Sequence, residues 1–311
     1  MSTALKGLGH HLPPSEERGG VRRPIAVAPG GPSQLAVPAA QAALLQAGIL
    51  AEVVDFIVFA TMTPNVTFPG AGCYFQAEMG CQTVGALDIR AQCAGFLYGL
   101  VVADRFVRAG VYSNVLVLGA EVHSSGLDYT DLGIDVARLY GDGAGAALFG
   151  PSTNTSTILA TALHSDGRRH RQFWIEYPAS RQHPVRMTVE NFRARQHLMT
   201  IDVDAVKSFS AQAIPAVADE ALAAAGMSRD QVDRFYIANV FPDVAEAAAR
   251  KLGVAESKLT NPAARHGHLT AAALPVALSE DVKAGTIDSG ATVCLVAAGA
   301  GFTWGAAVVR L

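Results

Sequence analysis

The chain has 311 residues, of which half are hydrophobic and only 16% are charged, so it can bury a large core and is not intrinsically disordered. The formal net charge of −3 gives no electrostatic basis for binding nucleic acid. Four cysteines are too few for a disulfide framework in a chain of this length, and they fit free thiols in a reducing cytoplasm, where we expect the protein to be.

Unbroken apolar runs, typical of strands that are buried on both faces, alternate along the chain with stretches of helical periodicity. We predict strands at Asp55–Ala60, Asn114–Gly119, Ala144–Phe149, Arg234–Ile237 and Thr292–Ala297, and helices at Leu35–Ala47, Gly95–Ala109, Val206–Ala225 and Val244–Leu252. This alternation predicts an α/β fold with helices on both faces of the sheet.

Two segments bear on a membrane association. Met1–Pro24 lacks the apolar run of a secretory signal. Ala291–Val309 is 19 residues without a charge, which is long enough to span a bilayer. Its three glycines favour two short buried strands around a turn instead, so we expect no membrane partner.

The chain contains a weak internal repeat. VRAG at residues 107–110 and VKAG at 282–285 lie 175 residues apart, and each closes a helical stretch that precedes an apolar strand and a glycine-rich strand. We therefore expect two halves, 1–150 and 151–311, related by a pseudo-two-fold axis. The same spacing relates Cys93 to His268, so these two residues should face each other across that axis.

The segment 168–195 interrupts the second half with seven arginines, two prolines and little periodicity. We interpret it as a long loop or cap. Its charges fit either solvated surface or a basic rim for the phosphates of coenzyme A or a phosphopantetheine arm.

Cys93 is the candidate nucleophile. It lies between a strand-like segment and a helical pattern, where the positive end of a helix dipole would lower the pKa of its thiol and favour the thiolate. A thiolate takes an acyl group from a thioester in a nearly isoenergetic exchange. His268 is the candidate acid–base group, and its neighbour His266 is the alternative.

The glycine-rich run GDGAGAALFG, residues 141–150, lacks the lysine of a phosphate-binding loop and leads into a strand, so dinucleotide binding is a poor interpretation. Such turns can instead expose N–H groups near Cys93 that stabilise a tetrahedral oxyanion. Cys73, Cys81 and Cys93 have no spacing typical of zinc ligands, so we expect no metal site.

Several segments together resemble the β-ketoacyl-acyl-carrier-protein synthase III family: ALDIRAQCAGFLYGLVVADRFVRAG, LYGDGAGAALFG, RHGHLTAAALPVALSEDVKAG and AGAGFTWGAAVVRL. The likeness covers nearly the whole chain. It implies the thiolase fold, with five layers in the order αβαβα, and a homodimer. It also implies ping-pong chemistry, in which an acyl group is loaded from coenzyme A onto cysteine and condensed with decarboxylated malonyl carrier protein. The only cofactor-like molecule would be the coenzyme A or phosphopantetheine thioester that serves as substrate.

The resemblance also assigns residues. Cys93 matches the acyl-bearing cysteine, and the N–H groups of Cys93 and Ala300 match the oxyanion hole, with Gly299 and Gly301 lining the substrate site in the same turn. Phe68 matches an aromatic residue that enters the acyl pocket of the partner subunit. We also expect the apolar strand Asn114–Gly119 to pair with its symmetry mate in the homodimer.

The chain departs from the family at three matched positions. Ala238 stands where the family has its catalytic histidine, and His268 stands where it has asparagine. Asp243 replaces an arginine that often docks the carrier protein. The N-terminal segment that holds an adenine-stacking tryptophan in the family is shortened, leaving Gly19–Arg23. These departures argue against ordinary fatty-acid initiation.

Three hypotheses follow. Cys93 and His268 could form an acyltransferase for an oxygen, nitrogen or sulfur acceptor in polyketide or other secondary metabolism, with His268 as general base. They could form a condensing enzyme in which His268 and Asn239 hold the enolate. The chain could also be a non-catalytic acyl-binding subunit. Losing one oxyanion donor typically costs ~10²–10³ in rate, which favours plain transfer.

Overall fold

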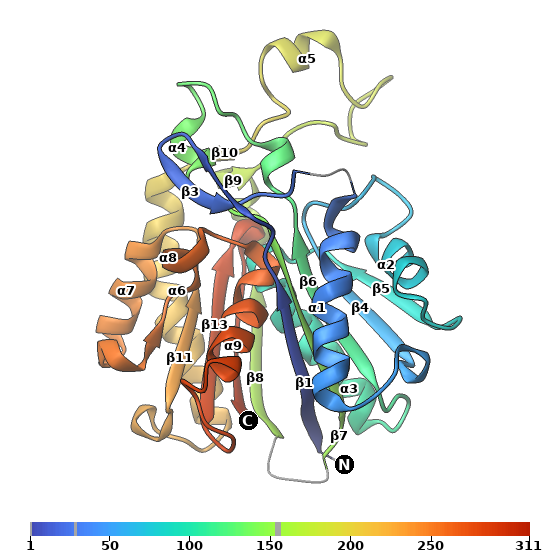
Figure 1. Ribbon diagram of the computed structural model, residues 1–311. Helices are drawn as coiled ribbons and strands as arrows, with labels where there is room; N and C mark the ends of the chain where they lie inside the picture. The colour runs from blue at the N-terminus through green and yellow to red at the C-terminus, as the bar shows by residue number, and fades with distance from the viewer. Residues whose placement is uncertain (1, 28–29, 153–156) are drawn as a thin grey trace.

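The computed structural model describes residues 2–27, 30–152 and 157–311. Two five-stranded sheets form its framework (Figure 1). The first has the strand order β1 (Thr3–His11), β7 (Gly143–Pro151), β6 (Val115–Glu121), β4 (Phe56–Ala60) and β5 (Gly85–Ile89). The second has the order β8 (Thr157–Ser165), β14 (Thr303–Arg310), β13 (Thr292–Gly299), β11 (Arg234–Ala238) and β12 (Leu259–Thr260).

The two sheets share one pattern of strand directions, which confirms the internal repeat. β4 runs parallel to both β5 and β6, and β11 runs parallel to both β12 and β13. The other pairs, β6–β7 and β7–β1 in the first sheet and β13–β14 and β14–β8 in the second, are antiparallel. The uncharged segment Ala291–Val309 therefore forms most of the hairpin β13–β14, as predicted. Among the described residues, no helix has both the length and the apolar character to cross a bilayer.

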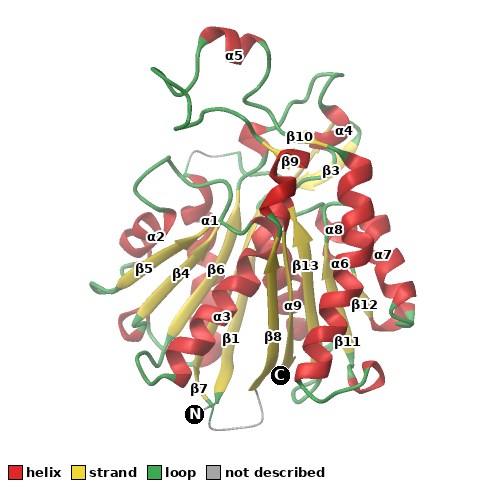
Figure 2. Ribbon diagram, turned by 180° about the vertical axis from the view of Figure 1, so that it is seen from behind, coloured by secondary structure: helices red, strands yellow, loops and turns green. Residues whose placement is uncertain are grey.

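Helices form three layers around the sheets. α1 (Gly31–Ala47) and α2 (Ala71–Met79) cover the outer face of the first sheet, and α6 (Val203–Ala224) and α7 (Pro242–Lys251) belong to the outer layer of the second. Helices α3 (Gly95–Arg108) and α9 (Ala273–Lys283) contact strands of both sheets, so they lie between them (Figure 2). This is the αβαβα arrangement of the thiolase fold, as predicted.

The ends of the outer helices follow from local sequence. Pro32 stands in the first turn of α1, where its missing N–H is not needed, and Gly48 ends the helix with a left-handed φ of 68°. Asp202 caps α6 by accepting a hydrogen bond from the N–H of Ala205. These signals place both helices within a few residues of their predicted positions.

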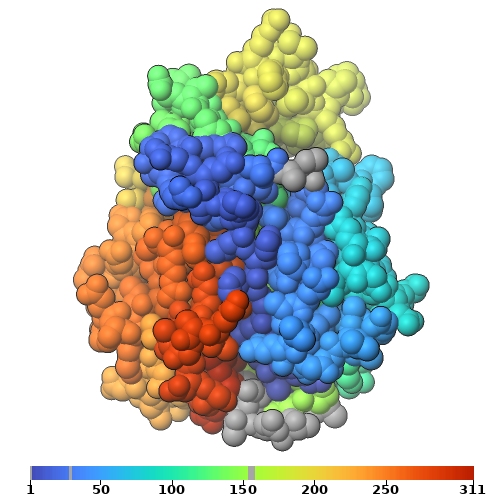
Figure 3. Space-filling model, viewed as in Figure 1, coloured from blue at the N-terminus to red at the C-terminus, as the bar shows by residue number. Residues whose placement is uncertain are grey.

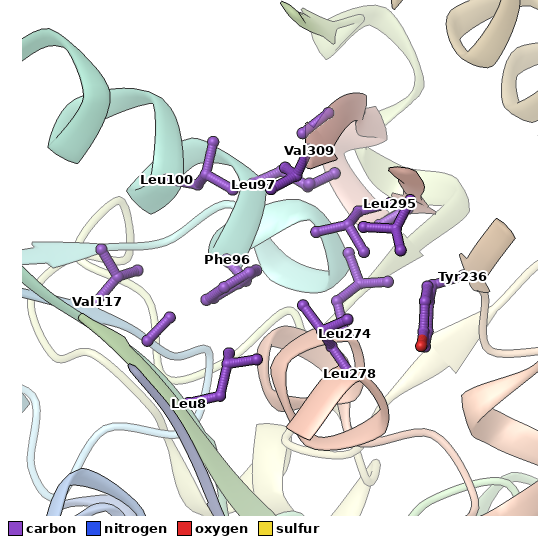
Figure 4. Close-up of a cluster of buried hydrophobic side chains, with 14 of the residues drawn as sticks. Leu8, Phe96, Leu97, Leu100, Val117, Tyr236, Leu274, Leu278, Leu295 and Val309 are labelled. Carbon is purple, nitrogen blue, oxygen red and sulfur yellow. The ribbon is translucent and has the colours of Figure 1, made fainter. Parts of the chain in front are cut away.

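The largest core lies in the central layer (Figure 4). Phe96, Leu97 and Leu100 of α3 pack there with Leu274 and Leu278 of α9, and both sheets contribute apolar side chains. Separate clusters lie under the outer helices of each half. Because the central core belongs to both sheets, the division into domains 1–150 and 151–311 stays a prediction.

The segment 168–195, which we call the cap, has little regular structure. It contains the short strand β9 (Phe173–Trp174), paired with β10 (Thr200–Ile201), and the short helix α5 (Val189–Arg193). Figure 3 shows this segment, in yellow, projecting from the body above the two halves. A hairpin of β2 (Ser15–Arg18) and β3 (Val21–Pro24), the short helix α4 (Ile134–Ala137) and α8 (Pro262–His266) complete the described elements outside the 3₁₀ turns.

One prediction about assembly is wrong. The strand predicted at Asn114–Gly119 is β6, which is hydrogen-bonded to β7 on one side and β4 on the other, so it has no free edge for a symmetry mate. Its continuous apolar run reflects burial between two helical layers. The free edge beside β4 belongs to β5, most of whose residues are exposed or half-buried.

Candidate active site

Cys93 and His268 meet across the two halves. The chain leaves β5, forms a single 3₁₀ turn at Gln92–Ala94 and enters α3. In the second half a matching turn, Thr270–Ala272, leads into α9 directly after His268. The Cys93 Sγ lies 2.9 Å from the His268 Nε2, although the residues are 175 positions apart. The 175-residue spacing of the internal repeat therefore predicted correctly that these two residues face each other.

The backbone of the first half holds His268 in place. Its N–H donates to the carbonyl of Leu139 over 2.6 Å, and its own carbonyl accepts from the N–H of Gly141 over 3.3 Å. The alternative histidine, His266, bonds through its Nε2 to Glu280 at 2.7 Å and lies on α8. The structure thus brings His268, and not His266, to the cysteine.

Burial sets the protonation of this pair. Desolvation raises the pKa of the Cys93 thiol and the nearby Glu121 raises it further, and these effects outweigh the backbone N–H groups that lower it. Desolvation, followed by the influence of His123, lowers the pKa of His268. Burial therefore opposes the thiolate that was expected at this helix start, and the directions of both shifts favour a neutral thiol beside a neutral imidazole.

The turn after β13 surrounds the sulfur from the other side. The backbone N–H groups of Cys93 and Ala300 both interact with the thiol of Cys93. A side chain on Gly299 would collide with Sγ and would place its Cβ 2.7 Å from the Cys93 Cβ. The Thr303 hydroxyl lies 2.9 Å from the carbonyl oxygen of Ala91 and 3.0 Å from that of Ala300, which ties this turn to the cysteine turn. Two N–H groups at one sulfur can also stabilise an oxyanion formed there.

A cavity of about 340 Å³ opens onto Cys93. Its apolar wall comes largely from the cap, through Phe173, Trp174 and Ile175, with Met62 and Met199 beside them. Its polar lining is Arg90, Gln92, Tyr140, His170 and Thr270, with Ala300 and Gly301 at the turn. The cap is therefore a wall of the cavity as well as a charged surface.

Basic side chains of the cap lie over its aromatic residues. The guanidinium groups of Arg171 and Arg181 each lie 5.6 Å from the centre of the Trp174 ring, whose residue lines the cavity. These charges are suitably placed for the phosphates of a coenzyme A or phosphopantetheine arm. In the described part of the chain, no three His, Cys, Asp or Glu side chains group as metal ligands would.

Asn239 does not join the pair. Its amide nitrogen donates to the Ser210 hydroxyl at 3.1 Å and to the Ala298 carbonyl at 3.0 Å, and its oxygen accepts from the N–H of Phe241. Among the described residues, none of its side-chain hydrogen bonds reaches Cys93 or His268. The pairing of Asn239 with His268 at one enolate, considered from the sequence, therefore has no counterpart here, because the amide is used to hold the end of β11.

Phe68 lies on the loop before α2 and is 81% exposed. It does not line the cavity of its own chain. A large aromatic side chain in this position is available to a second subunit, which is what the resemblance implies.

Sequence reasoning missed several residues around the pair. Glu121, fully buried at the end of β6, accepts hydrogen bonds from Thr61, Met62 and Thr63 and a longer one, 3.4 Å, from the N–H of Ala271. It thereby links the first half to the turn beside His268. Tyr140 lines the cavity, and its ring centre lies 5.9 Å from that of His268. The sequence did offer one signal for Tyr140. It directly precedes the glycine-rich run that begins at residue 141, and that run was expected to form turns near Cys93.

Known proteins resemble this chain over almost its full length. A family model described as 3-oxoacyl-[acyl-carrier-protein] synthase III matches residues 87–167, and the model of its C-terminal part matches residues 222–311. The β-ketoacyl-[acyl-carrier-protein] synthase III of Rhodospirillum centenum is 39% identical over 300 residues, covering 94% of this chain and 88% of the relative. That of Oceanobacillus iheyensis is 32% identical and covers 100% of this chain and 99% of its own.

A solved structure shares the fold. The 3-oxoacyl-[acyl-carrier-protein] synthase III of Aquifex aeolicus is 29% identical and superposes with a TM-score of 0.88, covering 99% of this chain and 100% of that one.

Proposed function

This chain belongs to the 3-oxoacyl-[acyl-carrier-protein] synthase III family of acyl-transferring enzymes, and we propose that it moves an acyl group from a thioester to an acceptor by way of Cys93. The donor would be an acyl-coenzyme A or an acyl carrier protein. The acceptor would supply an oxygen, nitrogen or sulfur nucleophile. The observation that carries the proposal is the 2.9 Å contact between the Cys93 Sγ and the His268 Nε2.

Loading begins from the neutral pair. As Sγ attacks the thioester carbonyl, its proton passes to Nε2 of His268, so a thiolate forms only when it is used. The N–H groups of Cys93 and Ala300 stabilise the oxyanion of the tetrahedral intermediate. The departing thiolate of the donor takes the proton back from Nε2, which leaves a neutral imidazole and an acylated cysteine.

Transfer would use the same imidazole in the second half of the cycle. Once Cys93 is acylated, its proton no longer occupies Nε2, so that nitrogen can accept the proton of the incoming nucleophile. The nucleophile attacks the acyl carbon, the carbon–sulfur bond breaks, and the proton returns to the sulfur. One histidine thus acts as base and then acid in both halves of the cycle.

Decarboxylative condensation is the second candidate, because the relatives at 32–39% identity have the name of a condensing enzyme. Plain transfer has the better support from this site. Stabilising an enolate needs donors aimed at its oxygen, whereas Ala238 has no polar side chain and the amide of Asn239 is engaged elsewhere. The loss of one such donor typically costs ~10²–10³ in rate.

One surface ion pair and two buried positions support a substrate other than that of fatty-acid initiation. Asp243, at the position that the resemblance assigns to a carrier-docking arginine, forms an ion pair with Lys207 at 2.7 Å. The side chains at 238 and 268 differ from the family pattern as well. A place in polyketide or other secondary metabolism is therefore part of the proposal.

Intact-mass analysis after incubation with a set of acyl-coenzyme A thioesters tests the loading step. We expect one acyl adduct on the tryptic peptide that contains Cys93, and no adduct in Cys93→Ala, because within the described part of the chain Cys93 alone among the cysteines has a hydrogen bond to histidine. Cys294→Ala is the matched control, since it removes a second fully buried thiol. An adduct on another cysteine, or none with any thioester, contradicts the mechanism.

The fate of malonyl thioesters separates the two candidates. We expect wild-type protein to release carbon dioxide from them at a rate ~10²-fold or more below that of acyl transfer to a suitable acceptor, because an enolate donor is missing. His268→Ala should stop acyl transfer, because it removes the one side-chain base that contacts the sulfur among the described residues. Fast decarboxylation by the wild type would establish the condensing function instead.

A further inference from the structure

Tyr140 has a buried hydroxyl that is left without a partner. The residue is only 2% exposed and lines the cavity that opens onto Cys93. Among the described residues, its oxygen has no hydrogen-bond partner. Buried hydroxyl groups are nearly always hydrogen-bonded in folded proteins, because an unpaired one loses its bonds to water without replacement. An unpaired hydroxyl in a substrate cavity therefore points to a bond made by a ligand.

Tyr140 lies next to His268 and lines the same cavity as Cys93. Tyr140 and His268 are partners in an isolated backbone bridge, so the two side chains start next to each other. The ring of Tyr140 also packs against that of His123, with centres 4.8 Å apart. Burial raises the pKa of Tyr140, and the charge that Cys93 can carry raises it further, so the phenol keeps its proton and can donate it in a hydrogen bond.

The adjacent imidazoles do not satisfy the hydroxyl. The Nδ1 of His268 is itself buried without a partner among the described residues, and both ring nitrogens of His123 are engaged elsewhere. The Nδ1 of His123 bonds to the carbonyl of Gly141 at 2.8 Å, and its Nε2 bonds to the Thr270 hydroxyl at 2.7 Å. The acyl group is the part of the substrate that is attached directly to Sγ. It is therefore the group that a phenol lining the same cavity would meet.

The charge of the cavity restricts the chemistry of that group. Its three most buried lining residues are Cys93, Tyr140 and Thr270, and none of them supplies a cation. Arg90 and His170 are exposed and mark the mouth. A carboxylate next to Tyr140 would lose its water without gaining a buried cation, which is costly. A neutral oxygen would gain a hydrogen bond at little cost.

We propose that the Tyr140 hydroxyl donates a hydrogen bond to a neutral oxygen, a hydroxyl or keto group, on the acyl chain that Cys93 carries. The site then selects oxygenated acyl groups over plain hydrocarbon acyl groups of the same length. This inference rests on the proposed loading of Cys93 and adds to it the class of acyl group.

The test compares rates of Cys93 loading by butyryl-coenzyme A and by its derivatives hydroxylated at the second, third or fourth carbon. We expect at least one hydroxylated ester to load about tenfold faster than butyryl in the wild type. In Tyr140→Phe, which removes only the hydroxyl, the ratio should fall to about one. Tyr98→Phe is the matched control, because it removes a tyrosine hydroxyl that bonds to the carbonyl of His164 outside the cavity, and it should keep the wild-type ratio.

Three outcomes overturn the inference. They are equal loading of all esters by the wild type, a preference that survives in Tyr140→Phe, and an effect confined to the later transfer step. If no ester loads at all, the proposed function has failed instead. The inference is then judged by equilibrium binding of the same esters to Cys93→Ala and to Cys93→Ala/Tyr140→Phe. The same preference must be present in the first variant and absent in the second.

Discussion

Two opposing effects act on the sulfur of Cys93. The start of α3 and the N–H groups of Cys93 and Ala300 favour the thiolate, while burial favours the thiol. Burial is the larger effect, and the same loss of water lowers the pKa of His268. A neutral pair in a dry site resembles the arrangement in which a hydroxyl nucleophile is activated by histidine only at the moment of attack.

The lowered pKa of His268 gives a prediction about pH. A histidine with the ordinary pKa of about 6.5 loses roughly fourfold in its neutral fraction between about pH 7.5 and about pH 6. Because the lowered pKa keeps His268 neutral at pH values below the ordinary histidine pKa, we expect single-turnover loading of Cys93 to change less than about twofold over that range. A half-maximal loading rate near about pH 6.5 would show that His268 titrates normally. The uncatalysed reaction of the same thioester with a free thiol serves as the control.

Residues near the pair differ in how far sequence could predict them. Cys93 and His268 were predictable because a duplicated order of elements brings equivalent positions to one axis. Asn239 was misleading because adjacency in sequence does not decide where an amide points, and here the end of β11 uses it. For Tyr140 and Glu121, only the fold shows that the hydroxyl of the first has no partner among the described residues and that the carboxylate of the second has several.

At the scale of elements, the turn after β13 is built around the absence of a side chain. Gly299 has an extended backbone, with φ near −161°, which any residue can adopt. The requirement for glycine at position 299 therefore comes from the close contact with Cys93 and not from the backbone conformation of Gly299. The turn and the cysteine can approach each other only because Gly299 lacks a Cβ.

Gly299→Ala should slow loading of Cys93 by roughly 10²-fold, because displacing the nucleophile or the oxyanion donor by about an ångström has effects of that order. It should also lower the free energy of unfolding by about 1–3 kcal/mol through overpacking. Gly167→Ala is the control, since a Cβ there meets nothing within 4 Å. Single-turnover mass spectrometry and chemical denaturation measure the two effects. Normal loading by Gly299→Ala would mean that the turn can move away without loss.

The elements themselves were largely predictable, and their order in the sheets was not. Buried strands and covering helices leave local patterns in the sequence, so their positions were found to within a few residues. Strand order depends on contacts between distant segments. An apolar run such as that of β6 fits an interior strand as well as a buried interface, which explains the mistaken assignment of the dimer strand.

At the scale of the whole molecule, the free edge of β5 is the best candidate for assembly. Edge strands present unpaired backbone groups that can continue a sheet across a two-fold axis. Leu87 on β5 is 39% exposed, and Phe68 is available in the same half. We propose a homodimer in which two β5 strands pair and Phe68 reaches toward the partner's cavity.

Leu87→Lys should weaken this dimer by about 10²-fold in Kd, because the symmetry would place two like charges close together. Light scattering over a concentration series should show a dimer for the wild type and a shift toward monomer for the variant. Leu45→Lys is the control. Leu45 is 82% exposed, but it lies on α1 near Ser279 and Lys283 of α9 and not on β5. A wild-type monomer at micromolar concentration, or an unaffected variant, would exclude the β5 interface.

The contact between Cys93 and His268 also means that the thiol can become reactive only late in folding. The two side chains come from opposite halves and meet only when the shared central layer has formed. An emerging or half-folded chain has a thiol with no base beside it and no oxyanion donor from the turn at residue 300. On the proposed function, such a chain would not capture acyl thioesters, so acylation of Cys93 would report the completion of folding.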